Sequence, residues 1–316
     1  MSAKASVKQL LLSKKITRNI LFFLFHKKLS RHVCDRQIDS YVKKQTVDAN
    51  KIVKDLWVCL TSFPARIDEV QYPVFSMLRQ AILPEKIILW LSEEQFPNKE
   101  GQLPQRLVSL RNSIFEIHWC EDLRSYKKLV PALSLNERKN IVICDDDIFY
   151  RKNTLKILWK EHLEHPNDVI CHIGKKMVFE EGAVLPYEKW QFVDTCTGQK
   201  DVLPIGGGTI LYPAEILENS PLLQNKELFK KLAFFADDIW FWWSITQAGY
   251  SVSVPNHSIK KMIYVNPERE YGLNEGLTLA KLNEGQNMND LQLRNIVEYF
   301  QTDIFTLTNK TSAKFK

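Results

Sequence analysis

The sequence lacks a long apolar run of the kind that crosses a membrane. A spanning helix needs about 20 consecutive apolar residues, whereas the apolar run from Ile20 to Phe25 in the N-terminal segment is six residues long. Lysine and arginine residues flank this run on both sides. We therefore expect that this segment does not cross a bilayer.

Cysteine pairs at redox or metal-binding spacing are also absent. No two cysteines form a C-x-x-C pair, and none joins a histidine in a cluster at zinc spacing. No cleavable secretory signal is recognisable. We therefore expect reduced thiols in a cytoplasmic protein. The six cysteines are Cys34, Cys59, Cys120, Cys144, Cys171 and Cys196.

The two common glycine signatures for nucleotides are missing as well. The cluster Gly206 to Gly208 is not followed by Gly-Lys-Ser/Thr, so it is not a Walker loop, and no G-x-G-x-x-G is present. The chain shows no internal repeat and no low-complexity segment. Its 316 residues with 45% hydrophobic content are ample for a globular core.

Positive charge is concentrated near the N-terminus. The formal net charge is +6, but residues 1–50 hold eleven Lys or Arg against three Asp, a balance of +8 that leaves about −2 for the rest. A nearly neutral domain argues against a nuclease or another nucleic-acid-binding protein, so we expect no nucleic-acid partner. The basic segment instead favours contact with an anionic surface.

This N-terminal segment also has a helical apolar pattern with cations beside it. The apolar positions are Leu12, Ile16, Ile20, Phe23 and Leu24. Such a stripe can lie in the headgroup region of an anionic membrane, which makes residues 1–35 a candidate membrane contact. It can also dock on the protein's own core. We divide the chain into a basic amphipathic, helical N-terminal extension, residues 1–50, and a folded domain, residues 51–316.

From about residue 51 the chain alternates short apolar runs with helical stretches, which is typical of an α/β domain. Such alternation builds a mostly parallel sheet flanked by helices, and these sheets bind ligands beyond the carboxyl ends of their strands. The expected strands are 56–63, 86–92, 114–120 and 141–144. The expected helices are 74–83, entered after Pro73, then 104–110, 155–162, and one within 236–249 that Gly249 closes.

Three consecutive aspartates, Asp145, Asp146 and Asp147, come directly after the run 141–144 in "IVICDDDIFY". Adjacent carboxylates repel one another, and a divalent cation is an economical compensation. If the strand continues through them, Asp145 and Asp147 point to the same side and Asp146 points away. Their oxygens suit Mg²⁺ or Mn²⁺, whose shell substrate phosphates can complete. The alternative is a solvated strand-to-helix turn in which aspartates cap the next helix.

A second acidic pair, Asp237 and Asp238, directly precedes "IWFWW". Capping and the helix dipole explain it as a plain helix start, whereas the functional interpretation makes one of the two a general base. In "DLRSYKKLVPAL", Lys127 and Lys128 can meet a phosphate. The glycines 206–208 let a backbone approach a ligand closely or adopt positive φ.

Taken in order, these segments resemble bacterial GT-A-fold glycosyltransferases that assemble cell-surface polysaccharides such as lipopolysaccharide, capsule or exopolysaccharide. The resemblance spans roughly residues 55–300. The matching segments are "TSFPARI", "SMLRQAILPEKIILWLS", "SYKKLVPAL", "IVICDDDIFY", "LPIGGGTILYP", "FFADDIWFWW" and "NDLQL".

The resemblance implies a Rossmann-like GT-A fold with a nucleotide-sugar half, about 51–150, and an acceptor half, about 151–316. It implies metal-dependent transfer of a sugar from a nucleoside-diphosphate sugar, UDP being the most common nucleotide, to a hydroxyl of a growing glycan or glycolipid. Together with the basic N-terminal segment, it favours a lipid-linked acceptor and a peripheral location on the inner face of the cytoplasmic membrane.

The resemblance also assigns roles to individual residues. Asp145 and Asp147 match the D-x-D that binds Mn²⁺ or Mg²⁺ with the diphosphate, with Asp147 closest to the metal. Asp238, with Asp237 beside it, matches the base that deprotonates the acceptor in inverting members. His257 falls where some members supply a histidine ligand to the metal, although a loop histidine is more often only solvated. The positions that match donor-binding residues are Thr61, Ser62, Arg66, Lys127, Lys128, Asp145, Asp146, Gly206, Gly207 and Gly208.

Two other classes stay open. A magnesium-dependent phosphotransferase or phosphatase can use the same Asp-rich strand end. A dehalogenase-type enzyme would need D-x-D-x-T/V near the start of its domain, whereas here Phe149 holds the last position and the motif lies mid-chain. A non-catalytic carbohydrate-binding or membrane scaffold protein can be rich in tryptophan, as this chain is, but it has no need for the acidic pairs.

Overall fold

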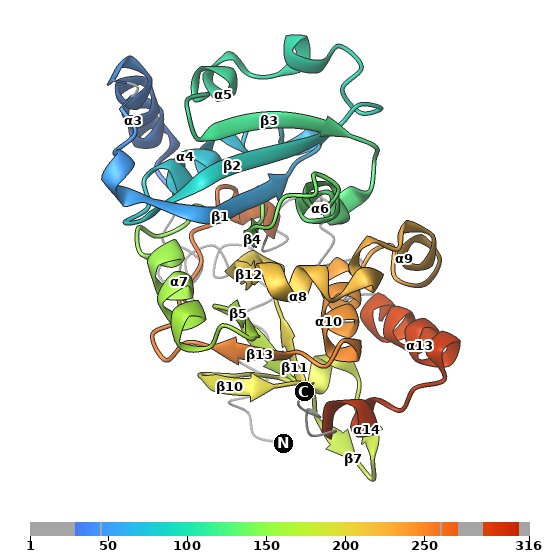
Figure 1. The fold of residues 1–316 in the computed structure, drawn as a ribbon. Helices are drawn as coiled ribbons and strands as arrows, with labels where there is room; N and C mark the ends of the chain where they lie inside the picture. The colour runs from blue at the N-terminus through green and yellow to red at the C-terminus, as the bar shows by residue number, and fades with distance from the viewer. Residues whose placement is uncertain (1–28, 45, 260, 271–286, 310–316) are drawn as a thin grey trace, which may run out of the picture.

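The computed structural model describes residues 29–44, 46–259, 261–270 and 287–309, and Figure 1 shows their arrangement. The apolar stripe expected between Leu12 and Leu24 lies outside these residues, so its role stays a prediction. None of the helices within the described ranges is long and apolar enough to cross a membrane.

An eight-stranded sheet runs through the centre of the molecule (Figure 1), in the order β10-β13-β5-β12-β4-β1-β2-β3. The pairs β1–β2, β2–β3, β1–β4 and β5–β13 are parallel, whereas β12 is antiparallel to β4 and β5, and β10 to β13. The predicted α/β class with a mixed, mostly parallel sheet is therefore confirmed. The strands are β1 (Ile52–Thr61), β2 (Leu83–Ser92), β3 (Phe115–Cys120), β4 (Asn140–Cys144), β5 (Asp168–Cys171), β10 (Cys196–Gln199), β12 (Ile210–Tyr212) and β13 (Ser251–Val254).

The central strands form from apolar runs that are buried on both faces. Along β1, Leu56, Val58 and Leu60 enter one hydrophobic core. The alternate residues Trp57 and Cys59 enter the core on the opposite face. This alternation follows the two-residue period of a strand, and burial of both faces is typical of parallel strands covered by helices.

Helices cover both faces of the sheet. One core contains residues of α3, α4, α5 and α7, for example Phe75 of α4 and Leu158 of α7. The other core contains residues of α8, α9, α10 and α13, for example Trp240 of α10 and Ile296 of α13. The helices are α3 (Arg31–Lys44), α4 (Gln71–Leu78), α5 (Gln105–Ser109), α6 (Val130–Leu133), α7 (Thr154–Glu164), α8 (Ala214–Glu218), α9 (Lys226–Leu232), α10 (Asp237–Gln247), α11 (Pro267–Glu270), α13 (Met288–Phe300) and α14 (Ile304–Asn309).

The helix expected at 74–83 starts earlier and is shorter. It is α4, which begins at Gln71 and has Pro73 in its first turn. Proline is accepted there because the first N–H groups of a helix have no intrahelical partner. The helix ends at Leu78, and β2 has already begun at Leu83.

The helix that begins at the second acidic pair forms as predicted. Asp237 and Asp238 stand in the first turn of α10, where the partial positive charge of the helix N-terminus stabilises carboxylates. Beyond the helix, Gly249 adopts a φ of +93°, a conformation that favours glycine. The chain then enters β13, so this helix is fixed at both ends by local chemistry.

The described part of the N-terminal segment, α3, packs on the domain. Its residues Cys34 and Ile38 are buried in the same core as α4. The Tyr72 hydroxyl of α4 donates a hydrogen bond to Asp35 Oδ1 at 3.0 Å. This helix therefore contributes to the core of the domain, although it precedes the boundary predicted at residue 51.

Two small sheets lie in the chain between β5 and β12. The strands β11 (Val202–Pro204), β6 (Gly174–Lys176) and β9 (Gln191–Phe192) form an antiparallel sheet. The strands β7 (Phe179–Glu180) and β8 (Ala183–Val184) form a hairpin. The three-stranded sheet brings Leu203 to the wall of a large cavity at the edge of the central sheet.

Candidate active site

A cavity of about 620 Å³ lies beyond the carboxyl ends of β1 to β4. This is the expected edge for a ligand in such a sheet, and the volume falls in the range of about 300–1,000 Å³ that is usual for ligand pockets. The start of α10 and the segment around Leu203 and Ile205 also line it. The predicted site residues that line the cavity are Thr61, Ser62, Arg66, Lys127, Lys128, Asp145, Asp146, Asp147, Gly207, Asp237 and Asp238.

The three consecutive aspartates do not continue the strand. β4 ends at Cys144, and the N–H of Asp145 donates to the Tyr150 hydroxyl at 2.8 Å, which ends the ladder. The condition under which Asp146 would point away from its neighbours, a strand that continues through them, is therefore not met, because the chain turns after Cys144. Asp146 and Asp147 share one partner, and Asp145 has a different one.

Arg66 is the shared partner. Its Nη1 lies 2.9 Å from Asp146 Oδ1 and 2.6 Å from Asp147 Oδ2, while the Ser62 hydroxyl donates to Asp146 Oδ2 at 2.6 Å. Burial raises the pKa of Asp146 above its usual value, and the opposing effects of Arg66 and Ser62 only partly offset this. The segment after β1 thus fixes the orientation of both aspartates.

Lys128 is the partner of the third aspartate and joins it to the second acidic pair. Its Nζ lies 3.1 Å from Asp145 Oδ1, 2.9 Å from Asp237 Oδ2 and 4.0 Å from Asp238 Oδ1. Burial lowers the pKa of Lys128, but the three carboxylates outweigh burial and hold it well above the usual value. A buried, charged ammonium therefore stands between Asp145 and the start of α10.

Asp238 carries the most perturbed carboxyl group of the cavity. Burial, opposed by Lys128 and reinforced by Asp237, raises its pKa from 3.8 to about 7. Its Oδ2 accepts a hydrogen bond from the Gly206 N–H at 3.0 Å, whereas Oδ1 accepts none from the described residues. About 26% of the side chain remains exposed. A carboxyl group with a pKa near the working pH is suited to general-base catalysis.

Asp237, beside it, is held in one orientation. The Ser125 hydroxyl donates to Asp237 Oδ1 at 2.8 Å, and the Lys128 ammonium lies against Oδ2. The side chain is only 11% exposed. Asp237 is therefore placed to act on Asp238 and Lys128 through its charge.

The three glycines have different surroundings. None of them has a positive φ, and the residue that adopts one is Thr209, at +70°. A Cβ on Gly206 would lie 2.7 Å from Lys128 Nζ and 2.9 Å from Asp238 Oδ1. Of the two roles expected for the cluster, close approach or positive φ, the structure therefore shows close approach, which at Gly206 is to Lys128 and Asp238.

We predict that Gly208→Ala destabilises the protein by about 1–3 kcal/mol, as overpacking does. A Cβ there would lie 2.9 Å from side-chain atoms of Ile173 and 3.0 Å from its backbone nitrogen. Gly207→Ala is the matched control, because its Cβ would meet only Ile148 Cδ1 at 3.4 Å and Asp145 Oδ2 at 3.5 Å. Urea unfolding measures both variants, and an equal loss of stability would contradict this account.

Lys127 and Thr61 line the cavity but already have protein partners. The Lys127 ammonium is buried, 2.8 Å from Asp122 Oδ1 and 3.5 Å from Gln95 Oε1. The Thr61 hydroxyl donates to the Trp90 carbonyl at 2.9 Å. Both residues therefore shape the wall at the ends of β1, β2 and β3.

His257 is not brought to the cavity. It is exposed in a turn after β13 and is not among the lining residues. Among the residues that the structure describes, no three His, Cys, Asp or Glu side chains are grouped to hold a metal ion. His257 therefore stands apart from the other predicted ligands, and its role as a metal ligand stays a prediction.

Several lining residues were not predicted from the sequence. Asp122 comes shortly after the end of β3, so the rule that drew attention to Asp145 also applies to it. The others come from loops, from two short 3₁₀ helices and from α13, where no local pattern marks them. The additional residues with polar or aromatic side chains are Phe63, Gln95, Asp122, Arg124, Ser125, Tyr187, Phe235, Tyr264 and Asn289.

Comparison with known proteins finds likenesses among solved structures. No protein-family description matches the chain, and no curated protein matches it. Among solved structures it is similar to S. aureus TarS, residues 1–349, at 19% identity, with 83% of this chain and 75% of that chain covered and a TM-score of 0.40. A likeness of this size does not assign a function, which has to come from the site itself.

Proposed function

We propose that this chain is a metal-dependent glycosyltransferase that moves a sugar from a nucleoside-diphosphate sugar to a hydroxyl of a bacterial surface glycan or glycolipid. The observation that carries the proposal is the charge around Lys128, where Asp145, Asp237 and Asp238 surround a single ammonium. A diphosphate would be repelled there unless a cation came with it. The resemblance of the sequence favours UDP as the nucleotide.

Mg²⁺ or Mn²⁺ fits this site by the chemistry of its oxygens. Asp145 and Asp147 both line the cavity, and Asp145 is 34% exposed. These ions are commonly bound by one or two carboxylates with substrate phosphates completing the shell, which suits a site without a full cage of protein ligands. When bound, the ion would neutralise charge that develops on the departing diphosphate.

The protein's own residues hold the donor side of the cavity in order. Arg66 and Ser62 fix Asp146 and Asp147, so these carboxylates do not have to be ordered when the donor binds. Lys128 places a positive charge beside Asp145, where it can act on a phosphate oxygen. Fixed charges of this kind stabilise a transition state without reorganisation.

Asp238 is the base in this proposal. The acceptor oxygen bonds to the anomeric carbon while the bond from that carbon to the phosphate oxygen breaks. The hydroxyl proton passes to Asp238, and the electron pair leaves with the diphosphate. A base opposite the leaving group gives inversion of configuration. Asp237 and Lys128 tune this base through their charges.

We further propose that residues 1–35 bring the enzyme to an anionic membrane surface on the cytoplasmic side, where a lipid-linked acceptor would be met. The support is the positive charge of residues 1–50 together with the apolar spacing within them. Because α3 starts at Arg31 and packs on the domain, the free contact would come from the residues that precede it.

Release of nucleoside diphosphate from a panel of nucleotide sugars tests the function. We expect release from one donor in the presence of Mn²⁺ or Mg²⁺, loss on chelation and recovery when the ion is restored. Transfer of phosphate from a phosphorylated substrate, with every nucleotide sugar left intact, would contradict the proposal and favour a phosphotransferase that uses the same aspartates.

A further inference from the structure

A short segment, residues 261–269, lies against the loop that carries the three aspartates, and we call it the strap. The Val265 N–H donates to the Asp147 carbonyl at 2.8 Å, and the Phe149 N–H donates to the Ile263 carbonyl at 2.8 Å. These bonds have the antiparallel pattern of a strand pair. Beyond the end of β4, the backbone at Asp147 is thus held by the strap.

The strap also contributes to the cavity wall. Tyr264 lies opposite Ile148 in the same antiparallel pairing, and both residues line the cavity. A displacement of the strap would therefore move a wall of the cavity and the backbone of Asp147 together.

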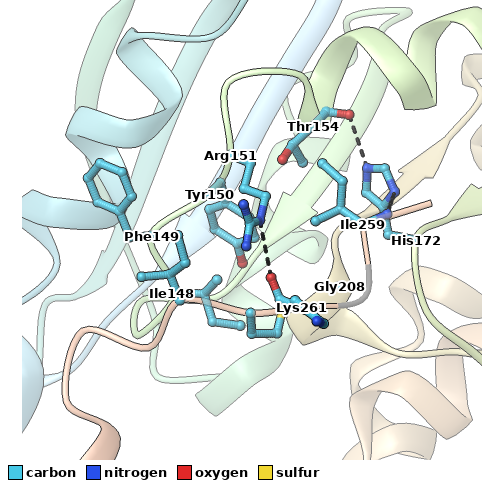
Figure 2. Close-up of a pocket in the computed structure, with 11 residues that line it drawn as sticks. Ile148, Phe149, Tyr150, Arg151, Thr154, His172, Gly208, Ile259 and Lys261 are labelled. Atoms are coloured by element: carbon cyan, nitrogen blue, oxygen red, sulfur yellow. Dashed lines mark hydrogen bonds between the residues drawn. The ribbon is translucent and has the colours of Figure 1, made fainter. Parts of the chain in front are cut away.

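The first end of the strap is anchored beside α7, in the small pocket shown in Figure 2. Before the strap, His172 Nε2 donates to the Thr154 carbonyl at 3.1 Å, and its Nδ1 accepts the Ile259 N–H at 3.0 Å. The Arg151 Nε donates to the Lys261 carbonyl at 3.4 Å (Figure 2). Burial lowers the pKa of His172 to about 4, so the ring stays neutral and Nδ1 stays an acceptor near neutral pH.

The other end is anchored by Glu69. Its Oε2 lies 2.8 Å from Arg269 Nη1, and its Oε1 accepts from Asn266 Nδ2 at 3.1 Å and from Arg31 Nη2 at 2.5 Å. The same Arg31 nitrogen also reaches the Val265 carbonyl at 3.3 Å. One carboxylate therefore joins the strap to the first residue of α3.

Glu69 belongs to the same turn as Arg66. The Glu69 N–H donates to the Arg66 carbonyl at 2.8 Å, and Arg66 holds the side chains of Asp146 and Asp147. Burial raises the pKa of Glu69, but Arg269 and Arg31 outweigh it and lower the pKa below its usual value. This one turn thus holds the aspartates through Arg66 and the strap through an ionised Glu69.

We propose that Glu69 is a positioning residue for the proposed transferase: it fixes the strap against the aspartate loop and so links α3 to the donor side of the cavity. The kinetic part of this inference rests on the proposed function. The structural part, that Glu69 holds the strap, does not.

Hydrogen exchange tests the structural part. Glu69→Gln keeps the shape of the side chain and removes its charge, so we expect the amides of Val265 and Phe149 to exchange on the order of tenfold faster. Glu85→Gln is the matched control, since Glu85 also binds a cation, Lys139, but at the opposite end of the sheet. Unchanged exchange at both amides in Glu69→Gln would overturn the inference.

Kinetics test the positioning role. If the strap is ordered only part of the time, the fraction of protein that can bind the nucleotide sugar is lower. Glu69→Gln and Arg269→Gln should therefore each raise KM for the nucleotide sugar about tenfold and leave kcat within about twofold. An unchanged KM beside faster exchange would overturn the role. If the wild type consumes no nucleotide sugar, the proposed function fails, and the exchange data still decide whether Glu69 holds the strap.

Discussion

Replacing Asp238 with asparagine is expected to lower kcat for sugar transfer by roughly 10²- to 10⁴-fold, the usual contribution of a general base. The amide keeps an oxygen that can accept from the Gly206 N–H, but it cannot take up the acceptor proton. Binding of the nucleotide should change by less than about twofold. Asp168→Asn is the control. Asp168 stands at the start of β5, outside the cavity, and accepts a hydrogen bond from the Ser253 hydroxyl of β13. Equal kcat values for wild type and Asp238→Asn would contradict the assignment.

The same residue sets an expected pH dependence. Because the pKa of Asp238 is raised to about 7, kcat/KM of the wild type should rise with pH as the base loses its proton, and the midpoint of this rise should lie near pH 7.

The pKa of Asp238 also affects stability. The folded state binds this proton more tightly than the unfolded state, so the stability of the wild type falls as pH rises from about 4 to about 7. The Tm of Asp238→Asn relative to wild type should therefore increase over that range, which thermal unfolding measures.

Lys128→Met is expected to have the largest effect on stability, about 3–5 kcal/mol near pH 8, because it leaves three neighbouring carboxylates, among them the 11% exposed Asp237, without their cation. Lys128 lowers the pKa of Asp238, so its loss should also move the midpoint of the pH–rate profile upward. Urea unfolding and kinetics across pH measure the two effects.

Lys127→Met provides the matched control for Lys128→Met. The two lysines are adjacent and both buried, but the Lys127 ammonium pairs with one carboxylate, that of Asp122, whereas the Lys128 ammonium faces three, of which Asp237 is only 11% exposed. The loss of stability should therefore be smaller than for Lys128→Met. Equal losses in the two variants would show that the three carboxylates around Lys128 do not depend on its charge.

The strands β1 to β4 are predictable because each contains an apolar run between turns. The strands expected at 114–120 and 141–144 match β3 and β4 to within one residue. The strands expected at 56–63 and 86–92 are found, but β1 and β2 begin four and three residues earlier. β1 opens with Ile52 and Val53, but Lys54 and Asp55 separate these two residues from the apolar run that starts at Leu56.

The position of the site is predictable from topology, whereas its internal pairing is not. Asp145 and Asp238 meet in one cavity because the first lies just past a strand end and the second starts a helix that packs beside it. That Arg66 binds Asp146 and Asp147, and Lys128 binds Asp145, depends on a turn after Cys144 that the sequence pattern does not encode.

Contacts across long sequence separations account for most of the features that the sequence did not predict. Glu69 and Arg269 are 200 residues apart, and no periodicity connects them. The docking of α3 depends on the burial of Cys34 and Ile38 in the core that also contains α4. The sequence of α3 is mostly polar and does not indicate this burial. The position of His257 outside the cavity could not be predicted either. It lies in a loop after β13, and local sequence does not fix the direction of such a loop.

The cavity is proposed to take a nucleoside diphosphate together with a divalent cation. Calorimetric titration of the protein with UDP, with and without Mn²⁺, beside the double variant Asp145→Asn/Asp147→Asn, tests it most directly. We expect binding that requires Mn²⁺ in the wild type and is lost in the folded double variant. UDP binding of equal strength without the ion, or unchanged in the double variant, would contradict it.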